Sequence, residues 1–192
     1  MFPVNWHVNI AYFGNVPNGK KLCDTYFLLM ELVGELFSLW IVPIILGGGQ
    51  DITYANYRAY DSVKKSLNLV SVDSRFDIGE LEPKMNSHNF LHHIVMDQPN
   101  NLFNFSNLGF QTFLNSQEEI DLMDKLFFEA YRLGEVNHNL TLAEPVLREA
   151  DVVSIDMGSV RMSDAPANSN DGPNGFYGDQ ICAISLYAGL SR

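Results

Sequence analysis

The sequence predicts an α/β protein, a three-layer α/β/α arrangement with a mainly parallel sheet. Short and almost wholly apolar runs at 41–46, 67–73 and 151–156 are typical of strands buried on both faces. Stretches with helical periodicity alternate with these runs, as in successive βα units. The 192 residues, of which 46% are hydrophobic and 18% charged, suffice for one sizeable core. With no repeat or linker in sight, we expect a single domain over 1–192.

The first half of the chain sets up this alternation. Leucines recur at helical spacing over 24–40, with Asp24 suited to the N-terminal cap. The run IVPIIL at 41–46 is predicted to be the first strand, and a glycine-rich turn then leads into a helix over 51–65. The run LNLVSVD at 67–73 is the second predicted strand, and it ends on a carboxylate.

The second half continues in the same way. Residues 102–110 are predicted to form a strand, and 151–156 (DVVSID) another that is buried and ends on Asp. The pattern SQEE at the start of 116–126 is a capping box, which marks the beginning of a helix. Residues 127–133 either continue that helix or form a strand. The remaining helices are expected at 87–96, 142–150 and 179–188.

Charge argues against a nucleic-acid partner. Twelve Lys and Arg stand against 23 Asp and Glu, a formal net charge of −11, whereas phosphate contacts need a basic face.

Cys23 and Cys182 match no zinc or redox spacing, and we expect two buried thiols in a reducing compartment. The N-terminus has no signal-peptide pattern, and Pro43 interrupts the longest apolar stretch. These features predict a cytoplasmic protein without a membrane partner.

Polar side chains gather where the predicted strands end. In open parallel sheets, ligands bind beyond the carboxyl ends of the strands. A single carboxylate at such a place is more often a helix cap or turn former, but three strand ends share the arrangement here. The residues concerned are Gln50, Asp51, Asp73, Arg75, Asp77, Asp156 and Asp164.

Four segments in this region resemble the ureohydrolases, the superfamily of arginase, agmatinase and formimidoylglutamase. GGGQDIT at 47–53 resembles the family's GGDHS turn, and VDSRFD at 72–77 resembles its DAHxD motif. SIDMGSVRMSDAPA at 154–167 is similar to the S-x-D-x-D segment, and PNGFYGDQICAI at 173–184 to the stretch that leads into the next helix. The likeness looks strongest to arginase-like or formimidoylglutamase-like proteins of bacteria.

The resemblance implies a hydrolase of linear amidine or guanidino C–N bonds that uses two Mn²⁺ ions and the water they share. It also implies where the metal ligands would lie. Three family ligand positions keep their carboxylates in this chain, Asp73, Asp77 and Asp156. Three others are substituted, by Gln50, Arg75 and Gly158. Arg stays protonated and cannot ligate, and Gly has no side-chain donor, so we expect at most one weakly held divalent ion.

The combination of retained and substituted ligand positions leaves two functions open. The chain is either a metal-dependent hydrolase or a non-catalytic relative that binds a small amidine or guanidino compound, or a partner subunit. His88 follows the DSRFD segment and is a candidate catalytic residue, although His88, His92 and His93 also fit a polar helix face. Arg75 is expected either to pair with Asp77 or Asp156 in place of a metal, or to point into solvent.

The resemblance further implies strands before and after those predicted here. We therefore expect a domain that is incomplete relative to the family. Unpaired sheet edges invite association, and ureohydrolases commonly form oligomers, so a homo-oligomer is the expected state.

Overall fold

A four-stranded parallel sheet forms the centre of the protein. The computed structural model describes residues 9–63, 66–79, 84–168 and 172–191. The strands are β1 (Leu67–Val72), β2 (Leu102–Phe110), β3 (Glu129–Arg132) and β4 (Val152–Ile155), and all neighbouring pairs run parallel in the order β3-β2-β1-β4. Residues 129–132, within the run that the sequence left undecided, thus form a strand. The parallel α/β prediction is confirmed.

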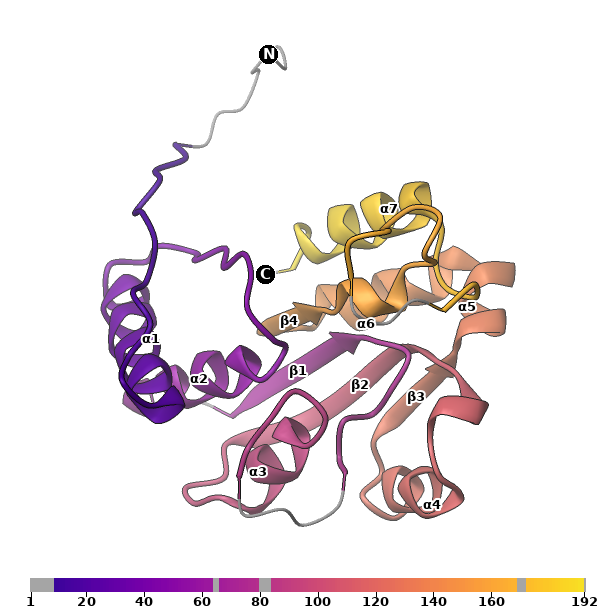
Figure 1. Cartoon of the computed structure of the whole chain (residues 1–192), viewed down its shortest axis with the longest axis horizontal. Coiled ribbons are helices and arrows are strands. Elements are labelled where there is room, and N and C mark those ends of the chain that lie inside the picture. The colour runs from indigo at the N-terminus through magenta and orange to yellow at the C-terminus, as the bar shows by residue number, and fades with distance from the viewer. Residues whose placement is uncertain (1–8, 64–65, 80–83, 169–171, 192) are drawn as a thin grey trace.

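Helices cover both faces of the sheet (Figure 1). One side carries α2 (Ile52–Ala59), α3 (Phe90–Met96) and α4 (Gln117–Lys125). The other side carries α5 (Leu133–His138), α6 (Ala143–Arg148) and α7 (Gly178–Ala188). The polypeptide runs from β1 to β2 and β3 through helices of the first side, then returns through α5 and α6 to pair β4 with the free edge of β1. The direction of winding therefore changes between β1 and β4.

Each face of the sheet has its own apolar core. On the first face, Leu69 of β1 and Phe105 of β2 pack with side chains of α2, α3 and α4, including Tyr57 and Ile94. On the second face, residues of β1 and β2 pack with α5, α6 and α7 in a separate cluster that comprises Val70, Val72, Leu108, Leu133, Val136, Ala143, Leu147, Ala150, Phe176 and Ile184. Alternate residues of β1 point to opposite faces, which explains why its sequence is apolar almost throughout.

Helix α1 (Leu22–Ser38) packs on α2. Its buried residues Leu29 and Val33 contact Ala55 and Ala59 of α2, so this helix lies outside α2 on the first side of the sheet. Asp24 is not the N-cap either. It occupies the third helical position, and its Oδ2 accepts from the backbone N–H of the N-cap Lys21 at 2.9 Å.

The segment 41–46 is not a strand, which corrects the first strand prediction. It runs past the sheet without pairing with any described strand, and Val42, Ile44 and Leu46 are 84–90% exposed. An apolar run becomes a strand only where a neighbour can bond its backbone, and Pro43 lacks an N–H to donate. β4 is correspondingly half-buried along its whole length, because only β1 borders it among the described strands.

The cysteines also differ from expectation. Cys23 of α1 and Cys182 of α7 are free, but both are exposed. In the part of the chain that the structure describes, no helix combines the length and apolarity needed to cross a bilayer.

Candidate functional site

The candidate site lies at the carboxyl ends of β1 and β4, where the winding direction changes. Such a switch point is the place at which open parallel sheets bind ligands. Asp156 follows β4 and donates its backbone N–H to the carbonyl of Val72 at 3.0 Å. This bond aligns the end of β4 with the segment 73–77 that leaves β1. The fold therefore places Asp73, Asp77 and Asp156 at one edge, as the sequence predicted.

Two of these carboxyl groups are almost fully buried. Asp73 is 1% and Asp77 5% exposed. Oδ1 of Asp73 accepts from the backbone N–H of Arg75 at 2.9 Å. Oδ2 is buried and receives no donor from the described residues, and the neighbouring Asp77 carboxyl can supply one only when protonated. Asp77 has a φ of 51°, a left-handed conformation that is uncommon outside glycine and is typical of functional sites.

Burial changes the acidity of this pair. The pKa of Asp73 is raised well above its usual range, mainly by desolvation and further by the charges of Asp77 and Asp156. Burial likewise raises the pKa of Asp77 to about 7, although the hydrogen bond with Asp73 and the charge of Arg75 lower it in part. Without a bound cation, the pair therefore retains a proton at neutral pH.

Gln50 and Gly158, which stand at substituted ligand positions, form hydrogen bonds with neighbouring protein groups. The side-chain amide of Gln50 donates to Ser71 Oγ at 2.9 Å and to Ser154 Oγ at 3.3 Å, across the neighbouring strands β1 and β4. Gly158 is buried, and its N–H donates to Asp156 Oδ1 at 2.9 Å. One oxygen of Asp156 is thus engaged by the turn that follows the strand.

Arg75 does not pair as the sequence hypothesis required. Its Nη1 donates to the carbonyl oxygen of Leu114 at 2.9 Å, and none of the ion pairs among the described residues joins it to Asp77 or Asp156. The side chain is only partly exposed, so the solvent-facing alternative is wrong as well. The reason is local geometry: the guanidinium reaches the turn after β2, while only the backbone N–H of Arg75 turns toward Asp73.

His88 stands at the rim of the site. Its Nδ1 lies 3.4 Å from Asp77 Oδ1, and its side chain is 65% exposed. The structure therefore brings this candidate next to a buried carboxyl, and its catalytic role stays a prediction. His92 and His93 lie on α3, where the His93 ring is 6.4 Å from that of Tyr54.

Two strand-end residues serve the fold. Asp51 accepts a hydrogen bond from the Tyr26 hydroxyl and so ties α1 to the start of α2. Asp164 accepts from Arg161 Nε at 3.0 Å and from the backbone N–H of Gly178 at 2.8 Å. Asp51 stands at the N-cap position of α2, but its side chain makes no cap hydrogen bond, whereas Asp164 stabilises the turn 161–164 and the start of α7.

Two asparagines that the sequence analysis missed hold the segment 73–77. The side-chain amide of Asn115 donates to Ser74 O at 3.0 Å, and its oxygen accepts from the N–H of Phe76 at 2.9 Å. Asn107 of β2 is fully buried and donates to Arg75 O at 2.9 Å. A polar residue in a strand that is otherwise buried was the available signal for Asn107.

The residues do not fit a two-manganese centre. Carboxylates suit Mn²⁺, and the free acceptor on Asp73 would be satisfied by a cation. Arg75 and Gly158 offer no donor, however, and Gln50 offers only its side-chain oxygen, which is buried without a partner among the described residues. Within the described ranges, no three His, Cys, Asp or Glu side chains are grouped so that they could hold one ion.

Comparisons with known proteins agree with this architecture. The sequence model of the arginase family matches residues 4–188 of this chain. A formimidoylglutamase from Staphylococcus carnosus is 25% identical over 183 residues, which cover 90% of this chain and 58% of the relative. A formimidoylglutamase from Fusobacterium nucleatum is 28% identical over 140 residues, which cover 69% and 41%. The chain thus spans less than two thirds of the length of these relatives.

Solved structures show the same fold. A Trypanosoma cruzi formiminoglutamase with Mn²⁺ superposes with a TM-score of 0.82 at 18% identity, over 90% of this chain and 61% of the other. An arginase from Bacillus subtilis gives 0.76 at 17% identity, over 93% and 73%. Because the family pattern extends over nearly the whole chain and the parallel sheet agrees with it, the chain belongs to the arginase family.

Proposed function

We propose that this chain is a non-catalytic relative of the ureohydrolases, which binds a small amidine or guanidino cation at the strand ends without hydrolysing it. The observation that carries the proposal is Arg75. It stands where the family resemblance places a metal-binding histidine, and its guanidinium is bonded to the Leu114 carbonyl. Since a guanidinium is always protonated, this position contributes a positive charge where a ligand would be needed.

The retained carboxylates supply the binding chemistry. An amidinium or guanidinium group presents a planar fork of N–H donors that can bond one carboxylate through two parallel hydrogen bonds. Asp73 has a buried oxygen without a donor, and Asp156 is half-buried beside it. A bound cation would replace the proton that the Asp73–Asp77 pair otherwise retains, so binding should release a proton.

A second function is favoured by the same three carboxylates. Their oxygens are of the type that Mn²⁺ and Mg²⁺ prefer, and if the three side chains moved together around one divalent ion, that ion would acidify a bound water for attack on a linear C–N bond. The curated relatives carry the name formimidoylglutamase, and this activity would place the chain among them. His88, 3.4 Å from Asp77, would then be available for proton transfer.

One experiment separates the two. The chain is incubated with excess Mn²⁺ and N-formimino-glutamate, arginine or agmatine, and release of formamide or urea is measured. The proposal expects no release above that of Asp73→Asn, together with saturable binding of agmatine or arginine by calorimetry in EDTA. Mn²⁺-dependent turnover that Asp73→Asn abolishes would establish the hydrolase, and absence of cation binding would remove the binding role.

A further inference from the structure

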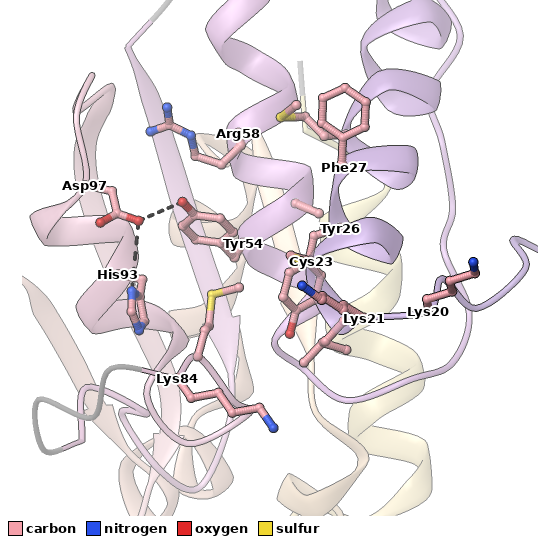
Figure 2. A pocket seen from close by; sticks show the side chains of 14 residues that line it. Lys20, Lys21, Cys23, Tyr26, Phe27, Tyr54, Arg58, Lys84, His93 and Asp97 are labelled. Atoms are coloured by element: carbon pink, nitrogen blue, oxygen red, sulfur yellow. Dashed lines mark hydrogen bonds and ion pairs between the residues drawn. The ribbon is translucent and has the colours of Figure 1, made fainter.

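A pocket of about 760 Å³ opens between α1, α2 and α3, on the helical layer (Figure 2). Its walls include Tyr26 and Met30 of α1, Tyr54 of α2 and His93 of α3, and Lys84 approaches from the loop before α3. The volume lies in the range of pockets that hold small organic ligands. None of Asp73, Asp77 and Asp156 lines it, so it is separate from the strand-end site.

The lining concentrates positive charge in an acidic protein. Lys20, Lys21, Arg58 and Lys84 are four of the twelve Lys and Arg in a chain of net charge −11. Arg58 is neutralised by Asp61 at 2.6 Å. For the three lysines, the described residues provide no ion-pair partner within 4.0 Å. In Figure 2 the ammonium of Lys21 lies beside Tyr26 and that of Lys84 lies at the lower rim of the pocket, whereas Lys20 extends away.

The acidic group in the lining is already engaged. Oδ2 of Asp97 accepts from the Tyr54 hydroxyl at 2.7 Å and lies 3.9 Å from His93 Nδ1. Burial and the hydrogen bond to Asp97 raise the pKa of Tyr54 to about 12, so its hydroxyl stays neutral. Asp97 keeps one negative charge, which the three lysines of the lining outnumber. Nε2 of His93 is buried and lacks a partner among the described residues, which leaves one more polar atom for a ligand.

Aromatic and thioether side chains form the apolar part. The rings of Tyr26 and Tyr54 are 6.5 Å apart and inclined by 59°, and both hydroxyls are fixed by carboxylates, Asp51 and Asp97. Met30 and Met85 add adaptable surface beside them. Rings held in this way present preformed faces to a flat ligand, with little loss of side-chain freedom on binding.

We propose that this pocket binds a small aryl anion, a ring that carries a carboxylate, phosphate or sulfonate. The ring lies against Tyr26 and Tyr54, and the anionic group lies between Lys21 and Lys84. This inference does not rest on the proposed function, because it uses no residue of the strand-end site. Neither a ring alone nor an anion alone uses both halves of the pocket, so affinity should require the two together.

Calorimetry with the whole chain tests this, with phenyl phosphate as the probe. Inorganic phosphate and benzyl alcohol each supply half of the ligand. We expect phenyl phosphate to bind at one site, at least about tenfold more tightly than either, and more weakly as salt increases. The double variant Lys21→Gln/Lys84→Gln should lose about tenfold or more in affinity, and the matched control Lys125→Gln on α4 should lose nothing.

Several results would overturn the proposal. These are no saturable binding of phenyl phosphate at millimolar concentration, equal affinity for inorganic phosphate, or the same loss in Lys125→Gln as in the double variant. All three lysines are exposed, so the variants should fold, and circular dichroism verifies this. Repeating the titration with Asp77→Asn in EDTA should give unchanged affinity, which keeps the result distinct from that of the strand-end site.

Discussion

The buried pair Asp73 and Asp77 dominates the chemistry at the scale of single residues. The pKa of each carboxyl is raised because the group is desolvated and lies near the charge of Asp156, and the charge of Asp77 raises the pKa of Asp73 further. Their presence at the end of β1 was predictable from the sequence, since a carboxylate directly after a buried strand must lie at the sheet edge. The direction of the Arg75 side chain was not predictable, because it depends on the Leu114 carbonyl, which lies 39 positions further along the chain.

The raised pKa of Asp77 predicts how stability depends on pH in the absence of metal. A folded-state pKa near 7, above the unfolded value, means that the folded chain binds more protons between about pH 4 and pH 7. Its free energy of unfolding should therefore fall as pH rises through that window. Asp77→Asn should flatten the dependence and make the protein more stable at pH 8, measured by urea unfolding in EDTA. The exposed control Asp124→Asn should keep the wild-type slope; an unchanged slope in Asp77→Asn contradicts the assignment.

The Arg75 contact predicts a modest structural effect. Arg75→Ala removes the hydrogen bond to Leu114 O and should lower the free energy of unfolding by about 1 kcal/mol. Urea unfolding at pH 7 in EDTA measures it, with Arg148→Ala on the exposed side of α6 as control. A loss of several kcal/mol would mean that the guanidinium neutralises the carboxylates after all.

At the scale of elements, sequence patterns predicted the structure correctly where the interacting residues lie close together in the sequence. The capping box of α4 is present as predicted, with Ser116 Oγ accepting from Glu119 N and Glu119 Oε2 from Ser116 N. The prediction of a strand at 41–46 was wrong because an apolar run becomes a strand only beside another strand. The neighbouring sequence does not show whether such a strand is present. The short helix α5 (Leu133–His138) was missed, because only six residues carry its periodicity.

The capping box predicts a measurable contribution from one side chain. Ser116→Ala should destabilise the protein by about 1 kcal/mol, because the backbone N–H of Glu119 at the start of α4 loses its acceptor, Ser116 Oγ. Thermal unfolding compares it with Gln117→Ala at the next position. Equal unfolding temperatures for wild type and Ser116→Ala would show that the cap contributes nothing.

The whole molecule presents an open sheet edge and an exposed apolar segment together. β4 is bordered only by β1 among the described strands, and Trp40, Val42, Ile44 and Leu46 are each more than 80% exposed. Surfaces of this kind mark interaction sites or aggregation hazards. The family and the parallel fold were predictable from four motifs that occur in the family's order. What covers the open edge of β4 and the exposed apolar segment was not predictable.

This surface predicts self-association. Sedimentation velocity should show species larger than the 21.6 kDa monomer at micromolar concentration. Val42→Lys/Ile44→Lys should shift the distribution toward monomer, and the control Leu186→Lys on α7 should not. A stable, well-folded wild-type monomer would refute the prediction.

The number of manganese ions per chain tests the central claim most directly, namely that this arginase-family chain does not assemble a two-metal centre. Calorimetric titration with Mn²⁺, checked by metal analysis after gel filtration, should reveal at most one weakly held ion, which Asp73→Asn removes. Gln50→His/Arg75→His/Gly158→Asp should raise the affinity, because it restores two imidazoles and a carboxylate. Two tightly bound ions in the wild-type chain would contradict the account.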